Sequence, residues 1–241
     1  MTVLHLADGG EAADLAAFLS RLLHYDRSAA VRLQAAGTAL AVFGRPPSFE
    51  VLAVRAVRLA KPYEDGLDVT LDVTVSAGEL LEAVDETAAT AGVPGAVTGP
   101  PWAGVLPPRG GWRTEPGLPA PGDLRALVAA AVAEFRARTG ELPPERRTRA
   151  ELDRIGREIW SRTVGDTGLP VRAVHAAQSL GFLRPTEAAG PSGAPGARGA
   201  SASGEDAPKL FSSGAWLRLR TPYGSVALRR AGAGALGISV R

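Results

Sequence analysis

The chain contains 241 residues, long enough for one large domain or two small domains, each with a buried core. A hydrophobic content of 45% with 22% charged residues is typical of a soluble globular protein and excludes a wholly disordered chain. The formal net charge is only +2, so a basic binding surface would have to arise from local clustering of cations. Cysteine is absent, which excludes disulfides and thiolate metal sites and suits a reducing compartment.

Arginine supplies almost all of the positive charge, since Lys61 and Lys209 are the only lysines and asparagine is missing. This bias toward Ala, Gly, Pro and Arg is what GC-rich codons impose, so a single arginine is weak evidence for a binding site. The N-terminal residues lack the basic and apolar regions of a secretory signal. No run of about 18 uncharged apolar residues is present. We therefore expect a cytoplasmic protein that does not contact a membrane.

The first part of the chain has the hydrophobic pattern of a helix followed by short strands. Apolar residues recur at spacings of three and four within 10–25, which predicts an amphipathic helix. Strands are predicted at 31–35, 38–43 and 51–59, with Gly37 turning the first pair.

A fourth strand is predicted at 67–75, "LDVTLDVTV", where apolar and polar residues alternate strictly. Its polar face, open to water or to a partner, carries Asp68, Thr70, Asp72 and Thr74. Ser76, followed by Glu79, is a capping box that predicts a helix directly after this strand. The predicted fold class is therefore α+β, with an antiparallel sheet and flanking helices over residues 1–98.

The second part of the chain reads as a connector and a helical subdomain. Residues 99–122 are rich in Pro and Gly, and two tryptophans, Trp102 and Trp112, indicate that this connector packs on something. Three helices are then predicted, at 123–138, 148–163 and 170–181. The second begins with a capping box from Thr148 to Glu151, and the third has Pro170 as its first residue. Together they predict one helical subdomain over 123–185.

Two segments complete the predicted organisation. Residues 186–208 are small, polar and rich in Gly and Pro, and we expect a disordered linker there. Residues 209–241 form a hairpin and a tail, in which "TPYG" at 221–224 is a type I turn. The hairpin closes the helical subdomain.

Three helices followed by a hairpin give an order that resembles winged helix-turn-helix regulators. The segment "LPVRAVHAAQSLGFL" at 169–183 is similar to their recognition helix, which ends in a Leu-Gly-apolar step. The resemblance implies that duplex DNA is bound in its major groove by Arg172, His175, Gln178 and Ser179. It also implies phosphate contacts from the wing residues Arg218, Arg220, Arg229 and Arg230.

Two features depart from the winged-helix pattern. The connection from Thr163 to Leu169 is longer than the usual turn of three to four residues. The linker also separates the third helix from its wing. The alternative is a helical subdomain whose last helix packs on the closing hairpin, with the arginines forming a solvated face.

Two other groups of polar residues are candidates for chemistry. Asp26 could orient His24 as a general base, or the two could simply end a helix. Asp68 and Asp72 lie about 13 Å apart at about 3.3 Å per residue, too far to share one water, and we expect them to keep the sheet face wet or to meet Arg55 or Arg58.

Neither a metal nor a cofactor is expected from the sequence. The three histidines lack metal-ligand spacing. The segment "GAGALG" at 232–237 matches the dinucleotide fingerprint, but only "ISVR" follows it, so no helix can hold a pyrophosphate there.

Two segments, "LLHYDRSAAVRLQAAG" and "WLRLRTPYGSVALRR", are similar to conserved uncharacterised proteins of high-GC Gram-positive (actinobacterial) bacteria. This likeness implies a lineage and no activity. We expect a non-enzymatic protein that touches duplex DNA through 170–181 and 214–230. The alternatives are a protein that binds another protein through the polar sheet face, and an enzyme of unfamiliar type at His24 and Asp26.

Overall fold

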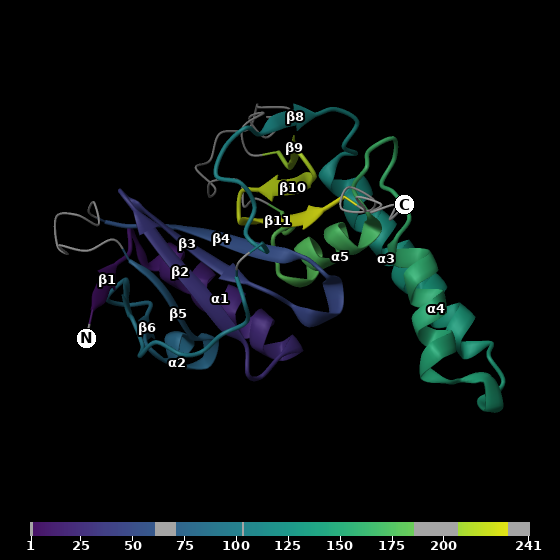
Figure 1. The fold of residues 1–241 in the computed structure, drawn as a ribbon, viewed down its shortest axis with the longest axis horizontal. Coiled ribbons are helices and arrows are strands. Elements are labelled where there is room, and N and C mark those ends of the chain that lie inside the picture. Colours follow the sequence, from purple (N-terminus) through teal and green to yellow (C-terminus); the bar gives the residue numbers. More distant parts are fainter. Residues whose placement is uncertain (1, 61–70, 103, 186–206, 231–241) are drawn as a thin grey trace, which may run out of the picture.

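The computed structural model describes residues 2–60, 71–102, 104–185 and 207–230 (Figure 1). Its strands are β1 (Val3–His5), β2 (Ala30–Ala36), β3 (Ala39–Gly44), β4 (Leu52–Arg58), β5 (Asp72–Ser76), β6 (Val84–Asp85), β7 (Thr90–Gly92), β8 (Arg113–Glu115), β9 (Lys209–Ser213), β10 (Trp216–Thr221) and β11 (Gly224–Arg229). Its helices are α1 (Gly9–Tyr25), α2 (Ala77–Glu82), α3 (Pro121–Gly140), α4 (Arg149–Trp160) and α5 (Val171–Ser179), with the 3-10 turns η1 (Pro47–Phe49) and η3 (Pro144–Arg146).

One antiparallel sheet of eight strands runs through the molecule in the order β5-β2-β3-β4-β11-β10-β9-β8. A small sheet, β1-β7-β6, lies beside α1. The central pairing is between β4 and β11, where Val54 lies opposite Ser225 and Leu52 lies opposite Ala227. The α+β class and the antiparallel sheet are confirmed. The sequence did not predict that the C-terminal strands continue the sheet begun by the first hundred residues.

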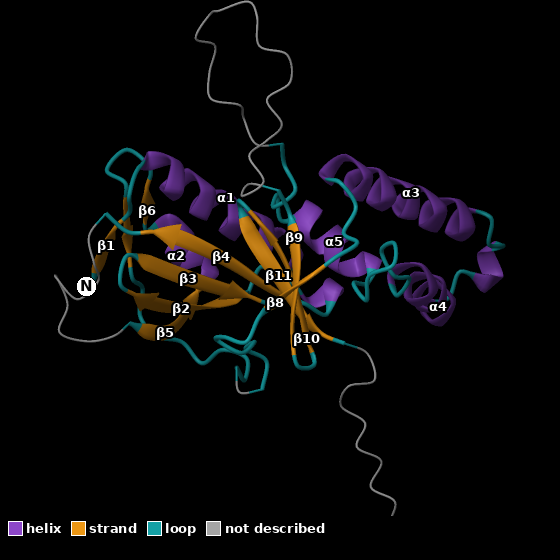
Figure 2. Cartoon of the chain, turned by 90° about the horizontal axis from the view of Figure 1, so that it is seen from above, coloured by secondary structure: helices purple, strands orange, loops and turns teal. Residues whose placement is uncertain are grey.

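The two faces of the large sheet differ because side chains alternate along each strand. On one face, Leu33 of β2, Val42 of β3 and Leu219 of β10 belong to a core that α1 and α5 cover. Figure 2 shows these helices on one side of the sheet. The stacked rings of Phe18 and Phe182, with centroids 5.7 Å apart, join the region of α1 to the segment after α5.

The other face of the sheet is partly covered by the connector. Trp102 is 7% exposed and packs with Phe43, Leu52 and Val54 in a second apolar cluster. The indole Nε1 of Trp102 donates to Thr74 Oγ1 at 3.0 Å. The expectation that Trp102 pins the connector is therefore confirmed, and a short strand, β8, forms within it.

Helix starts follow the predicted caps closely. The Ser76 and Thr148 side chains accept hydrogen bonds from the backbone N–H groups of Glu79 and Glu151. Helix α3 begins at Pro121 and runs to Gly140, two residues past each predicted end. Pro170 is the N-cap of α5 rather than its first residue.

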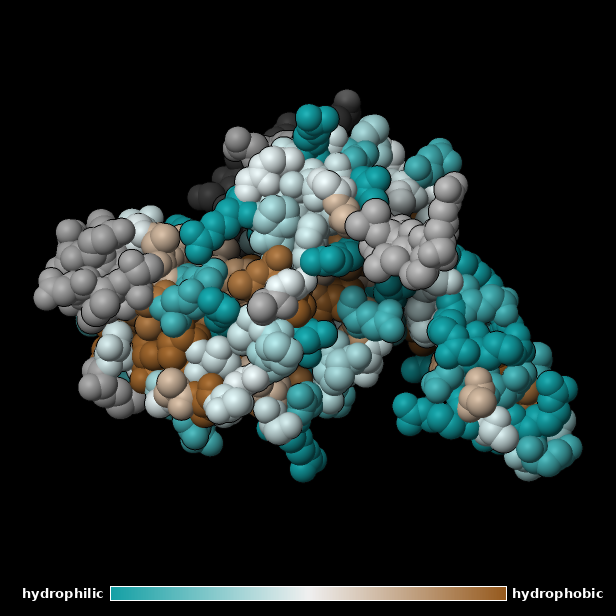
Figure 3. Space-filling model, viewed as in Figure 1, coloured by the Kyte–Doolittle hydropathy of each residue, from teal (hydrophilic) through white to brown (hydrophobic). Residues whose placement is uncertain are grey.

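Helix α4 packs on α3 and forms an arm that extends from the body of the protein (Figure 1). Its outer side carries a network of ion pairs in which Glu134 and Glu158 each contact Arg138 and Arg162. Figure 3 shows hydrophilic residues covering this arm. Arg138 and Arg162 of the arm are thus each paired with carboxylates.

Some predictions fall outside the described residues. They are the strand positions 67–70, with Asp68 and Thr70, the disorder of 186–206, and the tail at 231–241. Within the described ranges, no helix is both long enough and apolar enough to pass through a lipid bilayer.

Candidate anion-binding surface

Helix α5, the predicted recognition helix, is packed into the protein. Five of its nine residues are buried, and it contacts η1, α3 and β11. His175 lies between Phe49 and Trp160, with ring centroids 5.1 and 4.7 Å away, and burial lowers its pKa below the ordinary value. Gln178 is exposed, whereas Arg172 and Ser179 are half-buried. The expected open face for a major groove is not observed, because α5 is a core helix.

The hairpin of β10 and β11 is an internal part of the sheet rather than a projecting wing. It is flanked on one side by β4 and on the other by β9. Its turn fits closely against the segment after α5, because a Cβ added to Gly224, at φ 155°, would meet the Phe182 ring at 2.6 Å. The turn between β10 and β11 therefore requires glycine at this position.

The hairpin arginines separate into two groups. Arg230 forms an ion pair with Glu115 at 3.1 Å. Arg229 donates to the carbonyl oxygen of Gly104 at 2.9 Å and lies 5.2 Å from the Trp216 ring centroid. Arg218 and Arg220, by contrast, line a pocket with Lys209.

We call this cavity the cationic pocket. It has a volume of about 280 Å³ and lies where β4, β9, β10 and β11 meet. Its polar side chains are Lys209, Arg218, Arg220, Thr221 and Ser225. Among the residues that the structure describes, none that lines the pocket is acidic. The three cations therefore share a pocket whose described lining carries no negative side chain.

Strand register places these cations together. Arg220 lies opposite Lys209 on β9 and opposite Ser225 on β11, and cross-strand neighbours have Cβ atoms about 4.5–5.5 Å apart. Like charges in this position destabilise a sheet. Arg218 donates to the 2% exposed Ser225 hydroxyl at 2.9 Å. Burial, together with the charge of Arg220, lowers the pKa of Arg218. An anion bound in the pocket would offset both the repulsion between the cations and the cost of burying the charge of Arg218.

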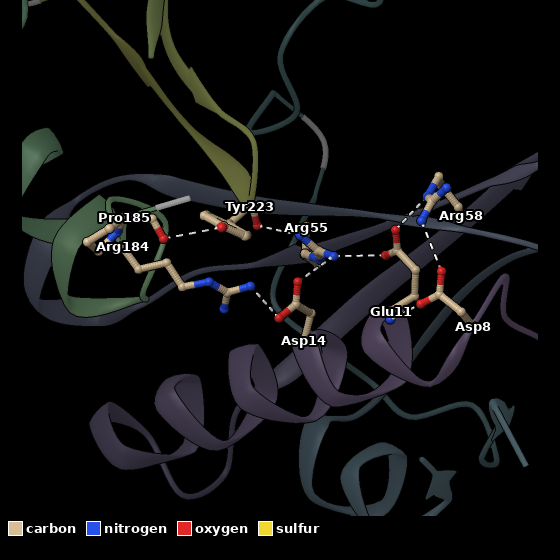
Figure 4. A network of polar contacts seen from close by, with 8 residues as sticks. All are labelled: Asp8, Glu11, Asp14, Arg55, Arg58, Arg184, Pro185 and Tyr223. Carbon is tan, nitrogen blue, oxygen red and sulfur yellow. Dashed lines mark hydrogen bonds and ion pairs between the residues drawn. The ribbon is translucent and has the colours of Figure 1, made fainter. Parts of the chain in front are cut away.

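Arginines on the helix-covered face have a different environment (Figure 4). Arg55 is 4% exposed and donates to Glu11 at 2.8 Å, to Asp14 at 3.2 Å and to the Tyr223 carbonyl at 2.8 Å. Arg58 shares Glu11 with it, while Arg184 pairs with Asp14 and lies 3.6 Å from the Tyr223 ring centroid. These carboxylates neutralise the arginines, so we interpret this cluster as a structural link between α1 and the β10–β11 turn.

The predicted polar sheet face is occupied by internal contacts. Asp72 forms two hydrogen bonds with Arg32, at 2.7 and 2.8 Å, and a third with Gln34. Asp72 pairs with Arg32 because Arg32 lies on the adjacent strand β2. Arg55 and Arg58, which were the expected partners, contact Glu11 of α1 instead. Thr74 accepts the hydrogen bond of the Trp102 indole.

The predicted catalytic pair does not form a site in the described residues. Asp26 accepts hydrogen bonds from the backbone and the hydroxyl of Ser28. His24 is exposed and contacts the edge of Tyr25. In the described ranges, no three His, Asp or Glu side chains gather where a metal ion would be held.

Sequence reasoning missed Lys209, Ser225 and Trp112. Trp112 donates to the Pro108 carbonyl and its ring lies 5.8 Å from the Arg218 guanidinium. The turn at Gly214, φ 53°, was the available signal, since a short connection there pairs 209–213 with 216–220 and brings Lys209 opposite Arg220. No local pattern indicates the pairing with β4.

Two families match the chain. Residues 1–104 match Domain of unknown function (DUF8010), and residues 107–233 match Domain of unknown function (DUF8185). No curated protein and no solved structure matches the chain significantly. The second match covers more than half of the sequence and includes every cation of the pocket, so the protein belongs to the family of Domain of unknown function (DUF8185).

Proposed function

We propose that the protein binds the phosphate backbone of a nucleic acid through the cationic pocket. The observation that carries this function is the grouping of Lys209, Arg218 and Arg220 without an acidic residue in the described lining. Guanidinium groups match phosphate geometry with several donors each. Phosphate contacts of this kind hold a nucleic acid in place without reading its sequence.

A single strand fits this surface better than a duplex. Helix α5 is buried on its core side and the hairpin lies within the sheet, so neither projects to fill a major groove. Single-stranded nucleic acids bind to grooves that combine cations with aromatic side chains. Here Phe211 lies opposite Arg218 and Trp112 lies beside it, and both rings are half-buried.

The test compares single-stranded and duplex oligonucleotides of random sequence by fluorescence anisotropy across a salt series. The key variant is Lys209→Met/Arg220→Met, which removes two pocket cations and leaves the packed Arg218 in place. If both contact phosphates, the slope of log K against log salt becomes shallower by about 1.4, at about 0.7 per phosphate contact for a single strand.

The matched control is Arg27→Met/Arg136→Met, which removes the same charge from two exposed positions outside the pocket. It should leave the salt slope unchanged. Equal losses in the two double variants would show that binding follows net charge alone and would refute the pocket as the site. Tighter binding of the duplex would refute the preference for a single strand.

Three further attributes belong to the same proposal. A cytoplasmic location agrees with the absence of cysteine, since a reducing compartment requires no disulfides. The excess of Ala, Gly, Pro and Arg, which GC-rich codons encode, suggests an actinobacterial origin. The order of helices and hairpin suggests a distant relation to winged-helix regulators. Fractionation of a native host and a solved structure of a relative would test them.

A further inference from the structure

A second cavity, which we call the junction cleft, lies near the ends of β10 and β11 that are remote from their connecting turn. It has a volume of about 700 Å³ and is lined by the loop after α1, the loop from β3 to η1, the connector, α5 and the two strands. This volume lies within the range of small-molecule sites, which often form where parts of a protein meet.

Three arginines line the cleft from three different segments: Arg45, Arg172 and Arg229. The Nε of Arg172 is buried and has no hydrogen-bond partner among the described residues. Its nearest carboxylate oxygen, on Glu50, is 3.6 Å away, beyond hydrogen-bond distance. A buried donor without an acceptor is rare in native proteins and requires an explanation, of which a bound group beside the guanidinium is one.

The other two arginines also keep donors free. Arg229 uses Nη2 for the Gly104 carbonyl, and most of its five N–H groups have no acceptor among the described residues. Arg45 is exposed and forms no ion pair in the described part of the chain. The cleft thus offers guanidinium donors from three sides.

Two carboxylates, Asp26 and Glu50, line the cleft in the described part of the chain and only partly offset the three arginines. Glu50 forms one long ion pair with Arg172, at 3.6 Å. Asp26 Oδ1 already accepts two hydrogen bonds from Ser28, and the Glu50 side chain is 78% exposed. Positive charge is therefore in excess, which favours an anion over a cation. The Trp216 ring at the wall adds a flat apolar surface suited to a planar group.

We propose that the junction cleft binds a small phosphorylated molecule that carries a planar ring, with a nucleoside monophosphate as the simplest example. Arg172, Arg45 and Arg229 hold the phosphate, and the ring packs near Trp216. This site is distinct from the cationic pocket, since the two cavities share none of their described lining residues.

The test is isothermal titration of the full chain with adenosine monophosphate, adenosine and inorganic phosphate. Wild-type protein should bind the monophosphate most tightly, because only this probe supplies both the phosphate and the ring. Arg45→Met and Arg172→Met should each raise its Kd at least about tenfold, the loss of roughly one charge-assisted hydrogen bond. Arg45 is exposed, so its variant keeps the fold even if the Arg172 variant does not.

Two controls separate this site from the cationic pocket. Arg27→Met removes an exposed cation near the loop after α1 but outside the cleft, and should leave the Kd unchanged. Lys209→Met/Arg220→Met should also leave it unchanged while weakening oligonucleotide binding. Monophosphate binding that is lost only in the Lys209/Arg220 variant, or that is absent from wild type at millimolar concentration, overturns the inference. Inorganic phosphate binding as tightly as the monophosphate overturns the role of the ring.

Discussion

Arg55 is the buried cation on which the link between α1 and the hairpin depends. Replacing it with Met removes hydrogen bonds to Glu11, Asp14 and the Tyr223 carbonyl. All three are charge-assisted because the guanidinium donor is ionised, and the two to carboxylates are also ion pairs. Breaking a buried ion pair costs about 3–5 kcal/mol. Glu11 and Asp14 keep other arginine partners. We therefore expect the free energy of unfolding to fall by about 3 kcal/mol.

Urea unfolding at pH 7, followed by tryptophan fluorescence, measures this loss as a lower midpoint with an unchanged m value. Arg58→Met is the matched control, because Arg58 binds the same Glu11 but its side chain is 69% exposed. Its midpoint should move much less, since exposed ion pairs are screened by water. Equal shifts in the two variants would refute the reasoning that burial makes Arg55 the dominant contact.

Three other predictions concern packing and pH. Gly224→Ala should destabilise by about 1–3 kcal/mol because its Cβ meets the Phe182 ring, and a double-mutant cycle should show a smaller cost in a Phe182→Ala background. Burial lowers the pKa of His175, so the protein is most stable above pH 6.5 and loses stability as the pH falls below it. His175→Gln should therefore reduce the change of the urea midpoint between pH 7 and pH 5. A midpoint that changes as much with pH as in wild type would count against this. Hydrogen bonding to Arg32 lowers the pKa of Asp72, so its stabilisation exists above about pH 3.8 and is lost as the pH falls through the folded pKa; Arg32→Met should therefore lower the midpoint at pH 7 and leave it nearly unchanged at pH 2.

Local patterns were sufficient to predict the two helices and the strands of the large sheet in the first hundred residues, but not the short strands β1, β6 and β7 of the small sheet. The spacing of Leu15, Phe18, Leu19 and Leu22 predicts α1, and these side chains are fully or almost fully buried in the structure. Ser76 and Thr148 predict helix starts because a cap uses atoms only three residues apart. Such signals are local in sequence, and tertiary packing rarely overrides them.

The candidate site depends on contacts between residues far apart in the chain. Val54 and Ser225 are neighbours across β4 and β11, although more than a hundred residues separate them. No alternation or turn in either strand selects that partner. The same limit explains His175: its helical position was predicted, but its burial depends on Phe49 and Trp160, which approach from other elements.

The pairing of β4 with β11 also brings residues of the two matched regions together at the cationic pocket. Val54 and Ala56, within the DUF8010 match, form one wall of the cationic pocket, whereas its cations lie within the DUF8185 match. Without β11, β4 would expose unpaired backbone N–H and C=O groups along a central position of the sheet. Arg55 adds a second connection across the same boundary by donating to Tyr223. Both the sheet and the pocket therefore require the two parts together, and the proposed anion site is formed by residues of both.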